Sequence, residues 1–160
     1  MGHAALNAVA AEANRLVFRA GPLLCALRLD DVIETLRPLP VRPLAGTPAF
    51  VLGVTVLRGR PAPVLDIARL LGAAEAAVSR FVAVRTEQGP VAFATGEVLG
   101  LRPAVADAGS RHPALPGPAA GALVAGYGRL GAEPLLVLRS MRVVPDTVWA
   151  AAAAPNAVPA

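Results

Sequence analysis

The chain has no lysine, one cysteine, two histidines and an aromatic fraction of only 4%. Its single cysteine, Cys25, excludes an internal disulfide and any zinc site built from several cysteines. The histidines, His3 and His112, are far apart in the sequence, and neither stands among clustered carboxylates. A bound metal needs several such ligands close together, so we expect neither a metal nor a cofactor.

Recognisable catalytic groups are also missing. Cys25 lies in the apolar run Leu23–Leu27, where it is expected to be a small buried hydrophobe. A cysteine nucleophile would need a histidine partner, and the sequence places neither histidine near it. The densest acidic group is Asp30, Asp31 and Glu34, and carboxylates on a half-buried strand are more often solvated or ion-paired than general acids. We therefore expect no catalytic residue and no enzymatic activity.

Membrane-spanning and export segments are not apparent. No apolar run approaches the roughly 18 residues that a membrane-spanning helix needs. Residues 1–14 lack the basic and apolar regions of a signal peptide. These features predict a cytoplasmic protein that reaches a membrane only through its partners.

The net charge of +4 and the sequence pI near 10.9 suggest nucleic acid as a partner. However, all fifteen basic residues are arginines scattered along the chain, and they do not alternate with phenylalanine or tyrosine. We expect no nucleic-acid partner. A basic nucleic-acid-binding module stays open as the alternative, and it predicts an affinity that falls steeply with salt.

The chain is rich in small apolar residues, glycine and proline. Its hydrophobic fraction of 55% is sufficient for a core, which must be built mainly from valine, leucine and alanine. Short apolar runs are separated by glycine and proline at intervals typical of a barrel or sandwich. Helices are expected only as short pieces: one over Asp66–Leu71, capped by Asp66 and ended by Gly72, and one beginning at Asp146.

A weak internal repeat indicates two similar small barrels. Three pairs of segments resemble each other at spacings between 65 and 71 positions. The pairs are 21–26 with 89–94, 31–38 with 97–103, and 58–65 with 129–136. Residues Gly126–Gly131 also match a dinucleotide-binding fingerprint, but Glu133-Pro134 blocks the helix that this fingerprint requires. We interpret that stretch as the turn region of a hairpin.

The segment 53–66 is the most specific pattern in the chain. It predicts two short strands folded about Arg58-Gly59-Arg60, with Gly59 supplying the positive φ of a tight turn. Pro61 and Pro63 are two positions apart, so their missing N–H groups fall on the same edge of the second strand. That edge cannot be fully hydrogen-bonded, and the alternatives are a bulge and an exposed face.

Two charged residues, Glu34 and Arg58, are embedded in apolar strands. They can be ordinary surface charges. Against this, an unpaired charge in such a setting is costly, so these two residues are candidates for a functional role, and a pair between them stays open.

The same residues resemble the CheW-like family of bacterial chemotaxis coupling proteins. The resemblance covers about residues 16–144 and is strongest over residues 47–72. It is carried by Thr47–Gly59, Pro63–Ile67 and Leu70–Gly72, with Val32–Leu36, Pro40-Val41 and Arg80–Val84 in the family's order.

The resemblance implies a mainly β fold of two five-stranded, SH3-like barrels packed around a common core. The double barrel would span residues 15–145, between an N-terminal tail (1–14) and an Ala/Pro-rich C-terminal tail (146–160). It implies an adaptor that joins a chemoreceptor's cytoplasmic tip to the regulatory domain of a CheA-type histidine kinase. The implied receptor- and kinase-binding residues are Glu34, Arg58, Gly59, Val32, Val54 and Val56.

Overall fold

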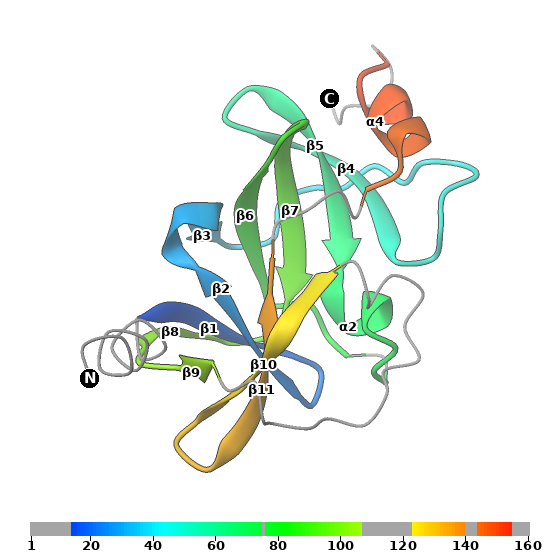
Figure 1. The fold of residues 1–160 in the computed structure, drawn as a ribbon. Helices are drawn as coiled ribbons and strands as arrows, with labels where there is room; N and C mark the ends of the chain where they lie inside the picture. The colour runs from blue at the N-terminus through cyan, green and yellow to red at the C-terminus, as the bar shows by residue number, and fades with distance from the viewer. Residues whose placement is uncertain (1–13, 75, 107–122, 140–143, 155–160) are drawn as a thin grey trace.

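The structure, a computed structural model, describes residues 14–74, 76–106, 123–139 and 144–154. The strands are β1 (Arg15–Ala20), β2 (Leu23–Arg28), β3 (Val32–Leu36), β4 (Val51–Leu57), β5 (Arg60–Asp66), β6 (Arg80–Thr86), β7 (Gly89–Thr95), β8 (Val98–Arg102), β9 (Val105–Ala106), β10 (Val124–Leu130) and β11 (Glu133–Leu138). The helices are η1 (Leu29–Asp31), α2 (Ile67–Leu70) and α4 (Asp146–Ala152). The expected mainly β fold with short helices is confirmed (Figure 1).

The strands form two sheets, and each sheet contains strands from both halves of the chain. The five-stranded sheet has the order β3-β6-β7-β5-β4, and the six-stranded sheet has the order β8-β1-β2-β11-β10-β9. Strand β3 follows the β1–β2 hairpin but pairs with β6, and β8 follows the β6–β7 hairpin but pairs with β1. The two expected five-stranded units are therefore present, and the two-residue strand β9 is added to one of them.

Three groups of buried side chains explain why the sheets hold together. One lies inside the five-stranded sheet and includes Leu57, Phe81 and Ala83, and another lies inside the six-stranded sheet. The largest joins the two sheets and includes Phe18 and Phe93, both fully buried. This third cluster is the common core that the family resemblance implied.

The repeat is real, but two of the three sequence alignments were shifted by two residues. In the turns, Ala20 pairs with Leu23 and Thr86 pairs with Gly89, so β6–β7 repeats β1–β2 at a spacing of 66 rather than 68. The β4–β5 and β10–β11 hairpins have matching bulges, between Val51 and Gly53 and between Val124 and Gly126, at a spacing of 73 rather than 71. Strands β3 and β8 also have matching bulges. Their corresponding residues are 66 positions apart in the sequence, which is the spacing that the sequence indicated.

Strand β5 confirms the prediction from its prolines. It lies between β4 and β7, and its parallel pairing with β7 begins only at Val64, after Pro61 and Pro63. The first half of β5 is therefore hydrogen-bonded on one side only. The expected turn of helix at the end of β5 is also confirmed, because the Asp66 carboxylate accepts a hydrogen bond from the backbone N–H of Arg69 at 3.2 Å.

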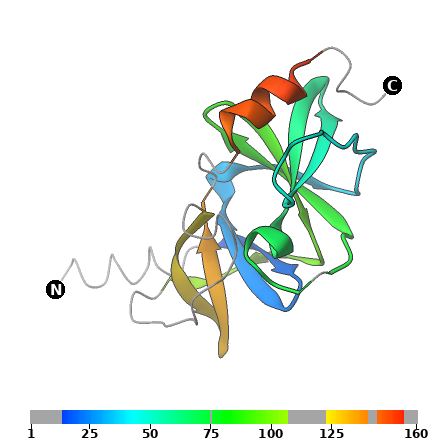
Figure 2. The ribbon, with the colours of Figure 1, turned by 90° about the vertical axis from the view of Figure 1, so that its right-hand side faces the viewer.

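Helix α4 begins at Asp146 as expected and covers part of the five-stranded sheet (Figure 2). Its Val148 and Ala152 are buried, and the Asp146 carboxylate accepts a hydrogen bond from the Gln88 side chain at 2.8 Å. The proposed tail 146–160 thus contains a packed helix, while its last residues, 155–160, lie outside the described residues, as do residues 1–13 and most of the predicted loop 102–121.

Candidate functional site

The β4–β5 hairpin ends in a two-residue turn of Arg58 and Gly59. The turn is closed by the pair Leu57 and Arg60, and both central residues have positive φ, 47° for Arg58 and 78° for Gly59. Two positive φ angles define the type I′ turn, whose twist matches that of the flanking strands. The conformation predicted for Gly59 is therefore confirmed.

Arg58 occupies a backbone conformation that its residue type rarely adopts. Among the described residues, it is the only non-glycine residue with a positive φ. This turn position favours asparagine, aspartate or glycine, and strained residues of this kind concentrate at functional sites. The arginine is therefore not there for the geometry of the turn.

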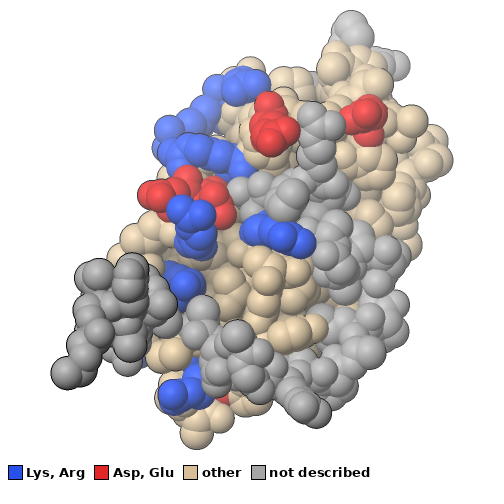
Figure 3. All heavy atoms as spheres, in the orientation of Figure 1, with Lys and Arg blue, Asp and Glu red and all other residues tan. Residues whose placement is uncertain are grey.

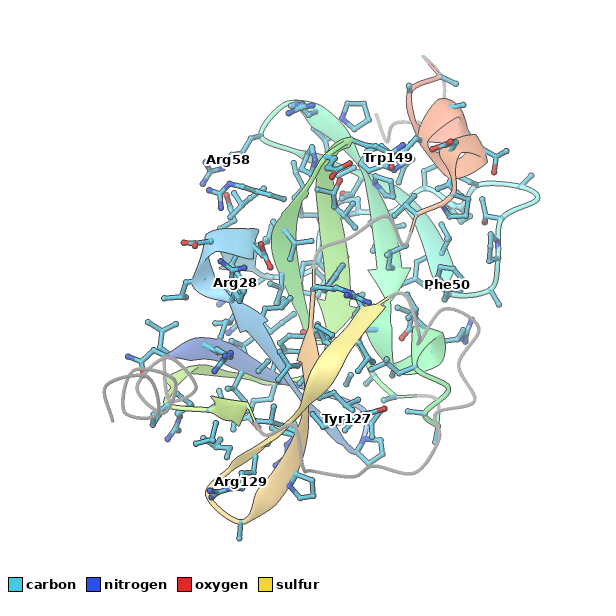
Figure 4. The ribbon with its side chains drawn as sticks, viewed as in Figure 1. Arg28, Phe50, Arg58, Tyr127, Arg129 and Trp149 are labelled. Atoms are coloured by element: carbon cyan, nitrogen blue, oxygen red, sulfur yellow. The ribbon has the colours of Figure 1, made fainter. Side chains whose placement is uncertain are left out.

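The structure brings Glu34 and Arg58 together from segments 24 positions apart. Glu34 follows a bulge at Ile33 in β3, and its Oε2 accepts a hydrogen bond from Arg58 Nε at 2.5 Å. The Arg58 side chain is labelled at the upper left of Figure 4. The side chains are 71% exposed for Arg58 and 34% exposed for Glu34. An ion pair this exposed contributes roughly 0–1 kcal/mol to stability, too little to explain a strained turn.

The three predicted valines are placed differently from one another. Val54 is fully buried and packs against Ala152 of α4, so in this structure it is a core residue. Val56 is half-buried on β4, an edge strand. Val32 is half-buried at the start of β3 and packs against the cluster that joins the two sheets. The structure therefore groups Glu34, Arg58 and Gly59 but leaves Val54 beneath α4.

Two further arginines line the same end of the sheet. Arg85 of β6 donates through Nη1 to the carbonyls of Asp30 and Val32, both at 2.9 Å, and Arg60 closes the hairpin turn. The sequence analysis places Arg60 in the hairpin turn and does not single out Arg85. Only the pairing of β6 with β3 places Arg85 here, and its sequence neighbours gave no sign of that pairing.

A pocket of about 240 Å³ opens between the hairpin end and strands β3, β6 and β7. Its lining residues are Ile33, Glu34, Leu57, Arg58, Arg60, Ala83, Arg85 and Pro90. Figure 3 shows basic side chains gathered around the free end of the hairpin, at the upper left. The site combines an apolar floor with three guanidinium groups and one carboxylate.

In the described part of the second half, the two positions that correspond to the charge pair are occupied by glycines. By the structural correspondence, the counterpart of Glu34 is Gly100, and that of Arg58 is Gly131 in the β10–β11 turn. Both glycines have positive φ, 91° and 58°. The fold repeats, but the ion pair belongs to one barrel.

Comparisons with known proteins agree with this architecture. The model of the CheW-like domain matches residues 15–147, which is most of the chain. The chain belongs to the CheW-like family. Members of this family are scaffold and adaptor proteins of chemotaxis-type signalling, a family that is generally non-enzymatic.

Two CheW-like relatives show how far the likeness extends. Protein FrzA of Myxococcus xanthus is 38% identical over 95 residues, which are 57% of this chain and 59% of that protein. The scaffolding protein TtCheW of Thermoanaerobacter tengcongensis has a similar fold, with a TM-score of 0.67 and 19% identity over 79% of this chain and 88% of that chain. The chain therefore spans less than two thirds of the curated relative, and the TtCheW likeness establishes the fold.

Other kinds of site find no support in the described part of the CheW-like domain. There, no group of three histidine, cysteine, aspartate or glutamate residues could hold a metal ion, and no helix is long and apolar enough to cross a membrane. Cys25 is fully buried in the common core, and burial raises the pKa of its thiol. A neutral buried thiol is a poor nucleophile.

The predicted hairpin at Gly126–Gly131 is present as β10 and β11. Beside its turn, Glu133 forms an ion pair with Arg19 at 2.5 Å. The hydrogen bond from Arg19 lowers the pKa of the Glu133 carboxyl. This pair is local to the six-stranded sheet, where it joins β1 to β11.

Proposed function

We propose that this CheW-like chain is a non-enzymatic adaptor that couples chemoreceptors to a CheA-type histidine kinase in the cytoplasm. The carrying observation is the Glu34–Arg58 ion pair on the strained turn of one barrel. The pair adds little stability, occupies an unfavourable backbone position and has no counterpart in the other barrel. These properties are expected of residues kept for contact with a partner.

Docking at this end would use Glu34, Arg58 and Gly59, with the half-buried Val32 and Val56 as apolar neighbours. A mutually oriented carboxylate and guanidinium give a partner surface charge complementarity, which improves specificity and association rate more than affinity. Val54 could take part only if α4 moved, because Ala152 packs against it.

The remaining contacts would lie on the sheet edges. Strands β3 and β4 are the edges of one sheet, and β8 is an edge of the other. The β8 edge carries Leu101, a large apolar side chain that is 53% exposed. An exposed edge with an apolar side chain suits strand-like and apolar packing with a kinase domain.

The mechanism follows from holding two partners at once. A receptor change that alters how the adaptor presents the kinase would shift the kinase between active and inactive populations. The chain needs no reacting group for this, only two separate docking surfaces.

The direct experiment is co-purification of the chain with a candidate kinase regulatory domain and with a receptor-tip fragment, singly and together. The adaptor function predicts two binary complexes and one ternary complex by size-exclusion chromatography. Failure to bind either partner, with the chain shown to be folded, would reject the function.

A further inference from the structure

The pocket beneath the charge pair has an excess of positive charge. Among its lining residues, Arg58, Arg60 and Arg85 are basic and only Glu34 is acidic. Glu34 is held by Arg58, and the ion pairs among the described residues include neither Arg60 nor Arg85. Two guanidinium groups at this site therefore have no carboxylate partner within the described part of the chain.

Strand β5 begins beside the pocket at Arg60 and is only partly paired there. Pro61 and Pro63 cannot donate to β7, so the two strands separate before Val64. The Arg60 side chain reaches across to the start of β7, where its Nη2 would lie 3.4 Å from a Cβ built on Gly89. Arg60 therefore lies beside the part of β5 that does not pair with β7.

The floor of the pocket is apolar and well supported. Leu57 and Ala83 are buried members of the cluster inside the five-stranded sheet, and Ile33 packs against that cluster. Pro90, which is also buried, closes the side toward β7. A rigid apolar floor under basic side chains suits a ligand with an apolar body and an anionic end.

The chemistry and the size together define the ligand class. Guanidinium groups bind carboxylates through paired N–H donors. The volume of about 240 Å³ lies below the range of roughly 300–1,000 Å³ that is usual for drug-sized ligands. The occupant is therefore small.

We propose that this pocket binds a carboxylate carried on a small apolar group, with Arg60 and Arg85 as its principal partners. Such a carboxylate can come from a free organic acid or from an acidic side chain next to an apolar residue in a partner protein. The proposal goes beyond the adaptor function and does not rest on it, because the pocket belongs to the isolated chain.

The test is a titration of the ¹⁵N-labelled full chain, followed by amide chemical shifts. Benzoate is the free acid, and benzamide is its uncharged match. A capped peptide Ala-Leu-Glu-Leu-Ala represents an acidic side chain of a partner protein. The same peptide with Gln in place of Glu is its uncharged match. We expect saturable shifts around Ala83 and Leu57 with a carboxylate probe and at least tenfold weaker binding of its uncharged match.

The variants identify the binding groups. Arg60→Gln removes the guanidinium charge but keeps a polar side chain, and it should weaken carboxylate binding about tenfold. Arg85→Gln also removes donors to β3, so it is interpreted only if its amide spectrum remains folded. Arg129→Gln, in the corresponding hairpin of the other barrel, is the matched control and should bind like the parent.

Each outcome decides something. Binding of benzoate alone assigns the pocket to a free acid, and binding of the glutamate peptide assigns it to a partner side chain. No saturable carboxylate binding, equal binding of the uncharged match or unchanged binding by Arg60→Gln would overturn the proposal. Kinase and receptor are absent from this test, so its failure leaves the adaptor function standing.

Discussion

The two barrels repeat the same five strands but differ at the exposed end of one hairpin. The first carries Arg58-Gly59 in its hairpin turn, with Glu34 facing it. The second carries Gly131-Ala132 in the same turn, and Gly100 stands in the place of Glu34. Positions shared by both halves build the sheets, whereas the position where they differ carries charge at the cost of backbone strain. The difference separates the residues needed for folding from those proposed for docking.

The largest expected effect concerns the core that the barrels share. Phe93 is fully buried between the sheets, so Phe93→Ala should lower the free energy of unfolding by about 4 kcal/mol. Because both sheets contribute to this cluster, we expect one cooperative transition in urea. The exposed Leu101→Ala is the control and should change little. Two separate transitions would show that the halves fold independently.

The next effect compares two glycines at corresponding bulges. A Cβ on Gly53 would lie 2.1 Å from the carbonyl oxygen of Arg42, and φ there is 146°. Arg42 bridges to Val54 through two backbone hydrogen bonds of 2.9 Å. Gly53→Ala should therefore destabilise the protein by about 3 kcal/mol.

Gly126 occupies the corresponding position of the second hairpin, and among the described residues no heavy atom apart from its chain neighbours lies within 4 Å of a Cβ built there. Gly126→Ala should be tolerated, so thermal unfolding of both variants measures the difference directly. Equal effects of the two changes would mean that the bulges do not correspond as described.

A smaller effect separates strain from docking. Arg58→Asn creates Asn-Gly, the preferred sequence for this turn, and should leave stability unchanged or raise it slightly. It also removes the partner of Glu34, so binding to receptor and kinase should weaken. Urea unfolding and pull-down assays on the same sample give both results. A clear loss of stability would show that Arg58 supports the fold rather than docking.

The smallest effect concerns the ion pair in the other barrel. Arg19 lowers the pKa of Glu133 through a hydrogen bond, so the pair adds stability above the ordinary glutamate pKa. This contribution is lost as pH falls through the lowered pKa. Glu133→Gln should reduce the urea midpoint slightly at pH 7. It should have no effect in acid, below the lowered pKa of Glu133. A larger difference at low pH would contradict this assignment.

Local chemistry made much of the fold predictable. The turn at Gly59, the cap by Asp66 and the incomplete pairing of β5 each depend on neighbouring residues, and each is confirmed. The repeat was recognised with a two-residue error in two segments. A strand shifted by two keeps the same side chains on the same face, so apolar pattern alone does not fix the alignment.

Contacts between distant segments were harder to predict. The apolar strands around Glu34 and Arg58 single out both residues but leave a pair between them open, and the structure joins them. Arg85 and the burial of Val54 beneath α4 depend on packing between segments that are not adjacent in sequence. The docking roles of Glu34, Arg58, Gly59 and the three valines stay predictions, because they concern partners.

The central claim is that the charge pair of the first barrel is a docking site. The most direct measurement is the affinity of the full chain for a receptor-tip fragment and a kinase regulatory domain after reversal of one charge. Arg58→Glu should remain folded but bind at least one partner about tenfold more weakly, which corresponds to about 1.4 kcal/mol. The double variant Glu34→Arg with Arg58→Glu should recover part of the loss.

Arg129→Glu makes the same charge change in the corresponding hairpin of the second barrel and is the matched control. The account predicts parent-like binding for Arg129→Glu and weakened binding for Arg58→Glu. Unchanged binding of both partners by folded Arg58→Glu would contradict the claim.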